Sequence, residues 1–156
     1  MSYISEKKND DDTLSFTISK LNVAYVNAIR RVILSDIETV GVITEPYEEN
    51  QLSIFKNTSK LHNEIIKHRI SCIPIHITDY TTRNIDDYTI VLDIKNTENL
   101  SMDVTTAYIN VKYKGELMTN QERNIIFPLN SLTNDHILIV KLSPNECIKF
   151  EGKLSL

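Results

Sequence analysis

Residues 22–37, with the sequence NVAYVNAIRRVILSDI, decide how this chain is organised, because they predict a long helix. Asn22 can cap its N-terminus through the side-chain oxygen, and neither proline nor glycine interrupts the run. At the helical period the apolar residues share one broad arc, formed by Val23, Val26, Ile29, Ile33, Leu34 and Ile37 and extended by Tyr25, Ala28 and Val32. An ordinary surface helix has an apolar stripe only a little over roughly 100° wide, and this arc is about twice as wide, so the helix should pack against more than its own sheet.

Arg30 falls inside this apolar arc. A guanidinium in that position needs partners, because burying an unpaired charge is very costly. The alternative is that Arg30 reaches water from an ordinary core helix by extending its aliphatic stem along the apolar surface. The pattern leaves both interpretations open. Ile33 is expected to fill core volume, so that Ile33→Ala should destabilise the chain by about 2–5 kcal/mol if the side chain is fully buried.

Two blocks of sequence resemble a known family. NAIRRVILSDI, at 27–37, resembles the signature helix of the alpha-like subunits of DNA-directed RNA polymerases: bacterial alpha, archaeal D and the third-largest eukaryotic subunit. Glu38 stands where the family usually has proline. NTSKLHNEIIKHRI, at 57–70, resembles a second family block, and SCIPI follows it at 71–75. The two blocks stand in the family's order and cover roughly the first half of the chain.

The resemblance implies a non-catalytic scaffold that pairs with an alpha-like or small polymerase subunit as a heterodimer and docks the large catalytic subunits. Carried over by motif position, the interface residues are Asn27, Arg30, Arg31, Ile33, Leu34, His68 and Arg69. Arginine suits such a contact because its planar fork bonds carbonyls and carboxylates together. The rival hypothesis is a stand-alone α+β protein-binding module, or a small enzyme, unrelated to polymerase.

Composition limits the functions that remain. The chain has 156 residues and a formal net charge of -4, with scattered basic residues, so we expect no tight nucleic-acid binding of its own. No apolar run approaches a membrane span, and the N-terminus lacks a signal-peptide core. The excess of Ile and Asn and the short length are consistent with a large DNA virus as the source. The resemblance then implies an intracellular location, either the nucleus or, for a viral protein, the host cytoplasm and the virion.

The first half of the chain should combine strands and two helices. We expect a flexible tail at 1–12, a half-buried strand at 13–19, the helix at 22–37, and strands at 38–44 and around 52–54. A second helix is predicted at 60–70, capped by 57–59, with Leu61, Ile65, Ile66 and Ile70 in its apolar arc. His62 lies in the same arc, either as a core histidine bonded to backbone or as a polar group in subunit assembly.

The pattern changes near Asp79, after which short apolar runs alternate with turn residues. Strands are predicted at 88–95, 104–114, 124–128, 137–142 and 147–156. The fold class is therefore α+β: an alpha-subunit-like dimerisation domain at 13–78 with 151–156, made of a sheet and two helices, and an inserted, mostly antiparallel β domain at 79–150. In the family the chain returns from its insertion into the first domain, and here the sequence stops near that return point, as a fragment or a compact variant would.

No catalytic or metal site emerges from the residue spacings. His62 and Glu64 have the H-x-E spacing of zinc deaminases, but the accompanying P-C-x-x-C is missing. His62 and His68 fall on different helix faces, so they do not make a zinc site. Cys72 and Cys147 are expected to be buried thiols rather than ligands. We therefore expect no metal, no cofactor and no catalytic residue.

Overall fold

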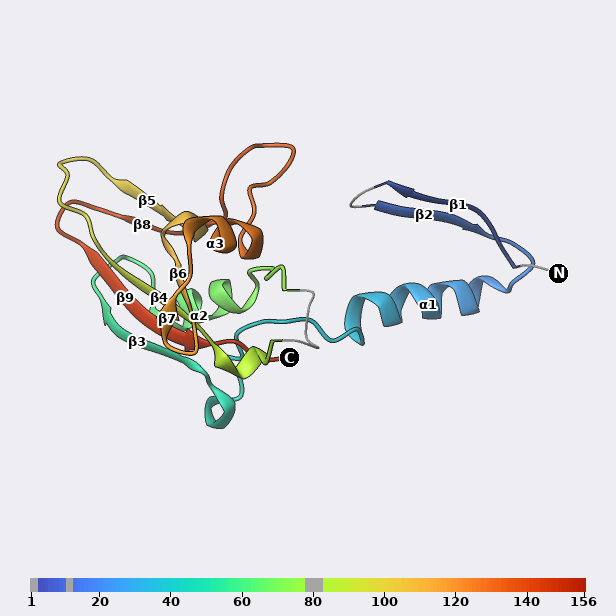
Figure 1. The fold of residues 1–156 in the computed structure, drawn as a ribbon, viewed down its shortest axis with the longest axis horizontal. Coiled ribbons are helices and arrows are strands. Elements are labelled where there is room, and N and C mark those ends of the chain that lie inside the picture. Colours follow the sequence, from blue (N-terminus) through green and yellow to red (C-terminus); the bar gives the residue numbers. More distant parts are fainter. Residues whose placement is uncertain (1–2, 11–12, 78–82) are drawn as a thin grey trace. The chain divides into compact units, whose positions relative to one another are not determined.

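The computed structural model describes residues 3–10, 13–77 and 83–156. Their contacts define two compact units, Met1–Glu38 and Thr39–Leu156, here called the N-terminal unit and the C-terminal unit (Figure 1). Within these described residues, three α-helices and antiparallel strands confirm the predicted α+β class. The predicted boundary at Asp79 lies outside the described residues, and the division into a dimerisation domain and an insertion stays a prediction.

The N-terminal unit consists of a β-hairpin followed by a helix. Strands β1 (Ile4–Asp10) and β2 (Thr13–Ile18) pair antiparallel, with Ile4 opposite Ile18. The prediction of a flexible tail at 1–12 is wrong for residues 4–10, which form strand β1. Residues 1, 2, 11 and 12 of the predicted tail lie outside the described residues. A polar segment can form this strand because pairing with β2 satisfies its backbone hydrogen bonds whatever its side chains are.

Helix α1 (Val23–Ser35) forms where the sequence predicts it. The side-chain oxygen of Asn22 accepts a hydrogen bond from the amide of Ala24 at 2.9 Å. Among residues 3–10 and 13–38 none is buried, and only Ile18 and Val26 are part-buried, so the expectation that Ile33 fills core volume is wrong. The arc is exposed because no other element of this unit covers it.

A five-stranded antiparallel sheet organises the C-terminal unit, in the order β3-β9-β4-β6-β7. Its strands are β3 (Leu52–Asn57), β4 (Tyr88–Lys95), β6 (Asn110–Tyr113), β7 (Glu116–Leu117) and β9 (Cys147–Lys153). Strands β5 (Met102–Thr105) and β8 (Leu138–Leu142) form a second, two-stranded sheet. Helices α2 (Asn63–Ser71) and α3 (Asn120–Ile126) complete the unit, and α2 contacts both β3 and β8.

The core lies between the two sheets and α2, and alternation along the central strands supplies it. Tyr88, Ile90 and Leu92 are buried on β4, and Ile148 and Phe150 are buried on β9. This period of two is the pattern from which the sequence predicts 88–95, 137–142 and 147–156 as strands, and all three are confirmed with small shifts of their ends. The C-terminal unit thus has an apolar core of its own.

Helix α2 begins later than predicted, at Asn63 rather than at residue 60. Asn57 explains the delay, because its Oδ1 accepts from the amide of Ser59 at 3.0 Å and its Nδ2 donates to the carbonyl of Leu61 at 2.8 Å, which closes a loop before the helix. His62 becomes the exposed N-cap residue, which excludes a core role for it. Ile66 is buried, as its place in the arc predicts.

Three predicted strands are wrong. The run at 104–114 splits into β5 and β6, which belong to different sheets, because a 3₁₀ turn at Thr106–Tyr108 with a buried Thr106 separates them. Residues 124–128 cover the end of α3, which an N-terminal capping box starts at Thr119. At 38–44 the chain is extended and buries Val40 and Val42, yet it pairs only through the isolated bridge from Gly41 to Ser155.

Candidate functional site

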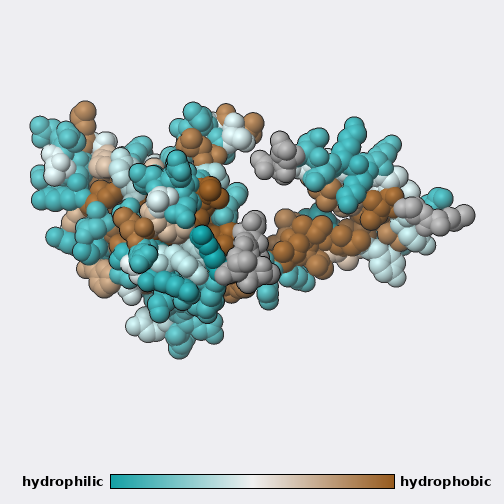
Figure 2. Space-filling model, viewed as in Figure 1, coloured by the Kyte–Doolittle hydropathy of each residue, from teal (hydrophilic) through white to brown (hydrophobic). Residues whose placement is uncertain are grey.

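The candidate site is the exposed apolar surface of the N-terminal unit. The exposed large apolar residues of this unit are Tyr3, Ile4, Leu14, Phe16, Leu21, Val23, Tyr25, Ile29, Val32, Ile33, Leu34 and Ile37. Figure 2 shows hydrophobic side chains, in brown, gathered over α1. Leu34 is 74% exposed and Ile33 is 51% exposed, although the sequence places both in the apolar arc. Hydrophobic side chains gathered on a surface in this way are typical of a protein contact rather than of a solvated face.

Part of this surface forms a groove between β2 and α1, with a volume of about 370 Å³. The groove is lined by Phe16, Ile18, Val26, Ile29, Arg30 and Ile33. The alternation of β2 places Phe16 and Ile18 on one face of the strand, and helical spacing brings the other four onto one face of α1. Local periodicity alone therefore builds both walls of this apolar groove.

Arg30 is the one charged residue in the groove lining. Its Nε donates to Oδ1 of Asn27, one turn earlier, at 3.1 Å. Both side chains are exposed, which agrees with the interpretation that Arg30 reaches water in the free chain. Arg31 and Leu34 also lie exposed on α1, and the carbonyl of Arg31 accepts from the hydroxyl of Ser35 at 2.9 Å.

The remaining two predicted interface residues lie in the C-terminal unit, on the last turns of α2. Nη2 of Arg69 donates to the backbone carbonyl of Leu138 at 2.7 Å, which fastens α2 to β8. His68 is exposed, with its ring Nε2 3.9 Å from Sγ of Cys72. The structure thus gives Arg69 a structural contact within the unit, while the interface roles of both residues stay predictions.

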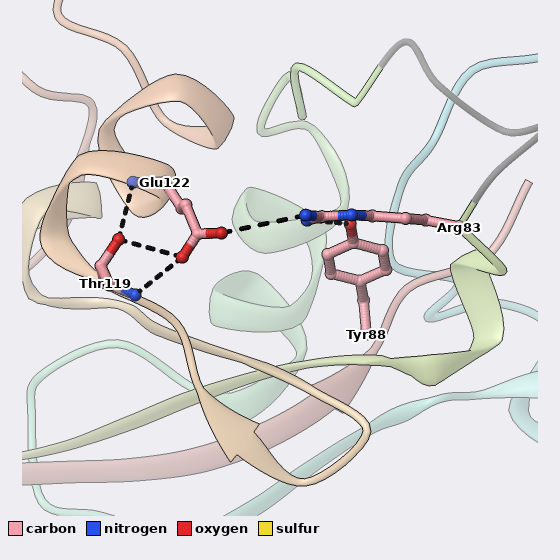
Figure 3. A network of polar contacts seen from close by, with 4 residues as sticks. All are labelled: Arg83, Tyr88, Thr119 and Glu122. Carbon is pink, nitrogen blue, oxygen red and sulfur yellow. Dashed lines mark hydrogen bonds and ion pairs between the residues drawn. The ribbon is translucent and has the colours of Figure 1, made fainter.

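A polar network near α3 was not anticipated from the sequence (Figure 3). Nη1 of Arg83 contacts the hydroxyl of Tyr88 at 3.4 Å, and its Nη2 lies 3.9 Å from Oε1 of Glu122. Glu122 also accepts from the amide and hydroxyl of Thr119, at 3.1 and 2.9 Å. The Arg83 guanidinium lies 5.4 Å from the centre of the Tyr113 ring. The T-x-x-E spacing from Thr119 to Glu122 is a capping-box signal that would have found the helix.

The charges of this network stabilise each other. The hydrogen bond to Tyr88, with a smaller effect of Glu122, raises the pKa of Arg83 above its usual value. The backbone and then the side-chain hydrogen bonds from Thr119 lower the pKa of Glu122. Arg83 and Glu122 therefore stay ionised at neutral pH, which suits a clamp between α3 and the start of β4 and gives neither a free nucleophile nor a base.

Metal and thiol chemistry have little structural basis in the part of the chain that is described. Within 3–10, 13–77 and 83–156, no three His, Cys, Asp or Glu residues converge as metal ligands. Cys72 is exposed and Cys147 is part-buried, so the prediction of two buried thiols is wrong. Cys72 follows the last residue of α2 and Cys147 is the first residue of β9, and side chains at the ends of elements are less enclosed than those in mid-strand. Among the helices of these residues, none is long and apolar enough to cross a membrane.

Comparisons with known proteins identify relatives along the whole chain, although no family model matches it. The DNA-directed RNA polymerases I and III subunit RPAC1 of Mus musculus is 29% identical in an alignment of 173 positions that covers 92% of this chain and 47% of that protein. The DNA-directed RNA polymerase subunit Rpo3 of Pyrococcus furiosus is 27% identical in an alignment of 157 positions that covers 98% of this chain and 51% of that protein. Rpo3 of Thermococcus kodakarensis is 32% identical over 88 residues, 54% of this chain and 31% of that protein. The chain spans about half the length of the curated relatives that match nearly all of it.

Proposed function

Because this chain is related to the alpha-like subunits of DNA-directed RNA polymerases, we propose that it is a non-catalytic assembly subunit of a multisubunit RNA polymerase. It pairs with an alpha-like or small polymerase subunit as a heterodimer, and the pair docks the large catalytic subunits during transcription. The alignments support this proposal because they run through both units of the chain and not only through the signature helix.

The observation that carries the proposal is the exposed apolar face of α1. Burying a large aliphatic or aromatic side chain that was in water contributes about 1.5–3 kcal/mol. Val23, Tyr25 and Leu34 are each more than two-thirds exposed, and they share the helix with the groove lined by Ile29 and Ile33. A partner helix laid along this face would therefore gain most of its binding energy from apolar contact.

Polar groups around the face fix the register of the partner. Asn27, Arg30 and Arg31 provide donors beside the apolar surface, and a partner carboxylate or carbonyl would meet them. His68 and Arg69, on the second motif, are proposed to contact the large subunits. Arg69 then has two roles, because one of its nitrogens already holds the carbonyl of Leu138 inside the C-terminal unit.

The proposed role gives this chain no catalytic, metal or cofactor site and no membrane anchor. The net charge of -4 favours assembly through protein contacts over tight binding of nucleic acid by the isolated chain. Its location follows from the complex that it joins, within the cell and, if the source is a large DNA virus, in the host cytoplasm and the virion.

Reversing the charge of Arg30 tests the proposal. In the assembled complex Arg30→Glu would leave a desolvated charge of the wrong sign, which costs about 3–5 kcal/mol, or at least about a hundredfold in affinity. Lys20→Glu makes the same charge change at an exposed position outside the groove lining and serves as the control.

Both variants and the parent chain are co-expressed, each with an affinity tag, with the polymerase subunits of the source organism, and the subunits that co-purify are identified. The melting temperature of each chain is measured separately in the absence of partners. We expect Arg30→Glu to lose the partner, while its melting temperature stays equal to that of Lys20→Glu. Full capture by Arg30→Glu would refute the interface assignment. A parent chain that stays monomeric and captures no polymerase subunit would favour the stand-alone module.

A further inference from the structure

The register of the five-stranded sheet gathers lysines that are scattered along the sequence. Residues that lie directly opposite each other in paired strands point to the same face of a sheet. One face of this sheet carries core residues such as Ile90, Val111 and Phe150, so the alternate residues form the opposite face, here called the outer sheet face. Five lysines share the outer sheet face, and all but the half-buried Lys112 are exposed: Lys56, Lys95, Lys112, Lys149 and Lys153.

Four of these lysines form two rows that cross the strands. In the first row, Lys112 of β6 and Lys153 of β9 both lie opposite Thr89 of β4. In the second row, Lys149 of β9 lies opposite Lys56 of β3. Like charges directly opposite each other destabilise a sheet. The pairing of Lys56 with Lys149 is therefore unfavourable unless negative charge lies close to both.

The outer sheet face has a positive surplus that its own carboxylates do not balance. Its acidic residues are Asp93 and Glu151, and Nζ of Lys149 donates to Oδ2 of Asp93. Among the residues that the structure describes, Lys149 is the one lysine of this face that forms an ion pair. Five lysines and two carboxylates give the face a formal charge of +3, although the whole chain has a net charge of -4.

From this charge pattern, and independently of the proposed assembly function, we propose that the outer sheet face docks an acidic polypeptide segment of another protein. Carboxylates of the segment lie over the two lysine rows and supply the partners that the lysines lack. Between the rows Val91 of β4 lies opposite Glu151 of β9, so the segment places an apolar or hydrogen-bond-donating side chain there. Charge complementarity of this kind steers association and fixes the register of the partner.

The arrangement of charges favours a polypeptide over a nucleic acid as the occupant. Lys149 and Lys153 are four residues apart on β9, which is about 13 Å, and Glu151 lies midway between them. A nucleic-acid backbone carries a phosphate at every nucleotide and would meet Glu151, whereas a polypeptide can omit a carboxylate at that point. The five strands of the sheet, all of them described, contain no arginine, the residue that binds phosphate in two places with its planar fork.

Titration of the whole chain with a fluorescein-labelled peptide of ten glutamates tests the proposal. At low ionic strength we expect saturable binding that weakens as salt is added. Lys112→Glu and Lys153→Glu should each weaken it about fivefold, because each removes one surface ion pair. Lys60→Glu makes the same charge change at an exposed position outside the sheet and is the matched control.

Two results of this titration would overturn the proposal. An equal loss of affinity in all three variants would show a response to net charge alone, without a docking face. Absence of saturable binding by the parent chain would show that the face does not dock an acidic segment.

Carbodiimide cross-linking of the same peptide to the parent chain makes the test independent of how the variants fold. The reagent joins a glutamate carboxylate to a lysine amine that it contacts, and mass spectrometry of the digested product identifies the lysine. We expect cross-links at Lys56, Lys112 and Lys153. Cross-links concentrated at Lys60 and Lys67 would place the peptide elsewhere and overturn the proposal. A single-stranded RNA of ten uridines that binds more tightly than the peptide at the same salt would overturn a polypeptide as the occupant.

Discussion

Ile33→Ala separates folding from assembly in this chain. Ile33 on α1 is 51% exposed, whereas Ile66 on α2 is fully enclosed at 0%. Truncation to alanine removes three carbons, worth about 0.8 kcal/mol each when buried, or about 2.4 kcal/mol together. A partner can newly bury only the exposed half, so Ile33→Ala should weaken binding by about 1.2 kcal/mol, which is about eightfold in Kd.

The melting temperature of the free chain should hardly change, because the N-terminal unit contributes no buried residue to the core. Ile66→Ala is the matched control, and the cavity that it leaves should lower the free energy of unfolding by about 2–5 kcal/mol. From the sequence we expected a loss of that size in the free energy of unfolding for Ile33→Ala. The structure indicates instead that Ile66→Ala causes it, because Ile66 is the buried residue.

The assay pairs thermal denaturation followed by circular dichroism with a calorimetric titration of the partner, for both variants and the parent chain. We expect Ile33→Ala to change the titration but not the melt, and Ile66→Ala to change the melt. If Ile33→Ala lowered the melting temperature as far as Ile66→Ala, α1 would have to pack into the core and the reasoning would be refuted.

Two further predictions concern the C-terminal unit. A Cβ at Gly152 would lie 2.8 Å from the Leu52 Cδ1 atom in the core, so Gly152→Ala should lower the free energy of unfolding by about 1–3 kcal/mol in a denaturant titration. Gly41→Ala is its control, because a Cβ there meets nothing within 4 Å, and an equal loss in both variants would contradict the steric argument. The lowered pKa of Glu122 means that its contribution to stability is present above its unfolded pKa and disappears as the pH falls through the folded pKa. An NMR titration should show the Glu122 pKa rising part of the way toward its usual value in Thr119→Ala, because the variant removes the hydroxyl bond and keeps the backbone amide. An unchanged pKa would contradict the contribution assigned to the hydroxyl.

Local signals were sufficient for much of the fold. The cap at Asn22 and the uninterrupted period of 3.6 predicted α1, and alternation predicted β4, β8 and β9. These signals depend on residues close in sequence, which is why they survive without tertiary information. The two motif blocks likewise led to the polymerase relatives, because a motif is a property of sequence order.

Other features depended on contacts between distant residues. Thr106 breaks a run that reads as one strand, because β5 and β6 pair with different partners, β8 and β4. The polar strand β1 is specified by its pairing with β2 and not by its own composition. Arg69 reads as a surface or interface cation until Leu138, remote in sequence, places a carbonyl against it.

The clearest division between the two kinds of information lies in helices α1 and α2. The sequence by itself determined which side chains share a face on each helix, because that follows from the helical period. Only the tertiary structure decided which face is covered: Ile66 and Ile70 of α2 are buried in the C-terminal unit, whereas Ile33 and Leu34 of α1 remain exposed. The physical reason is that burial is a property of what packs against a face, and neither composition nor periodicity specifies what will pack there.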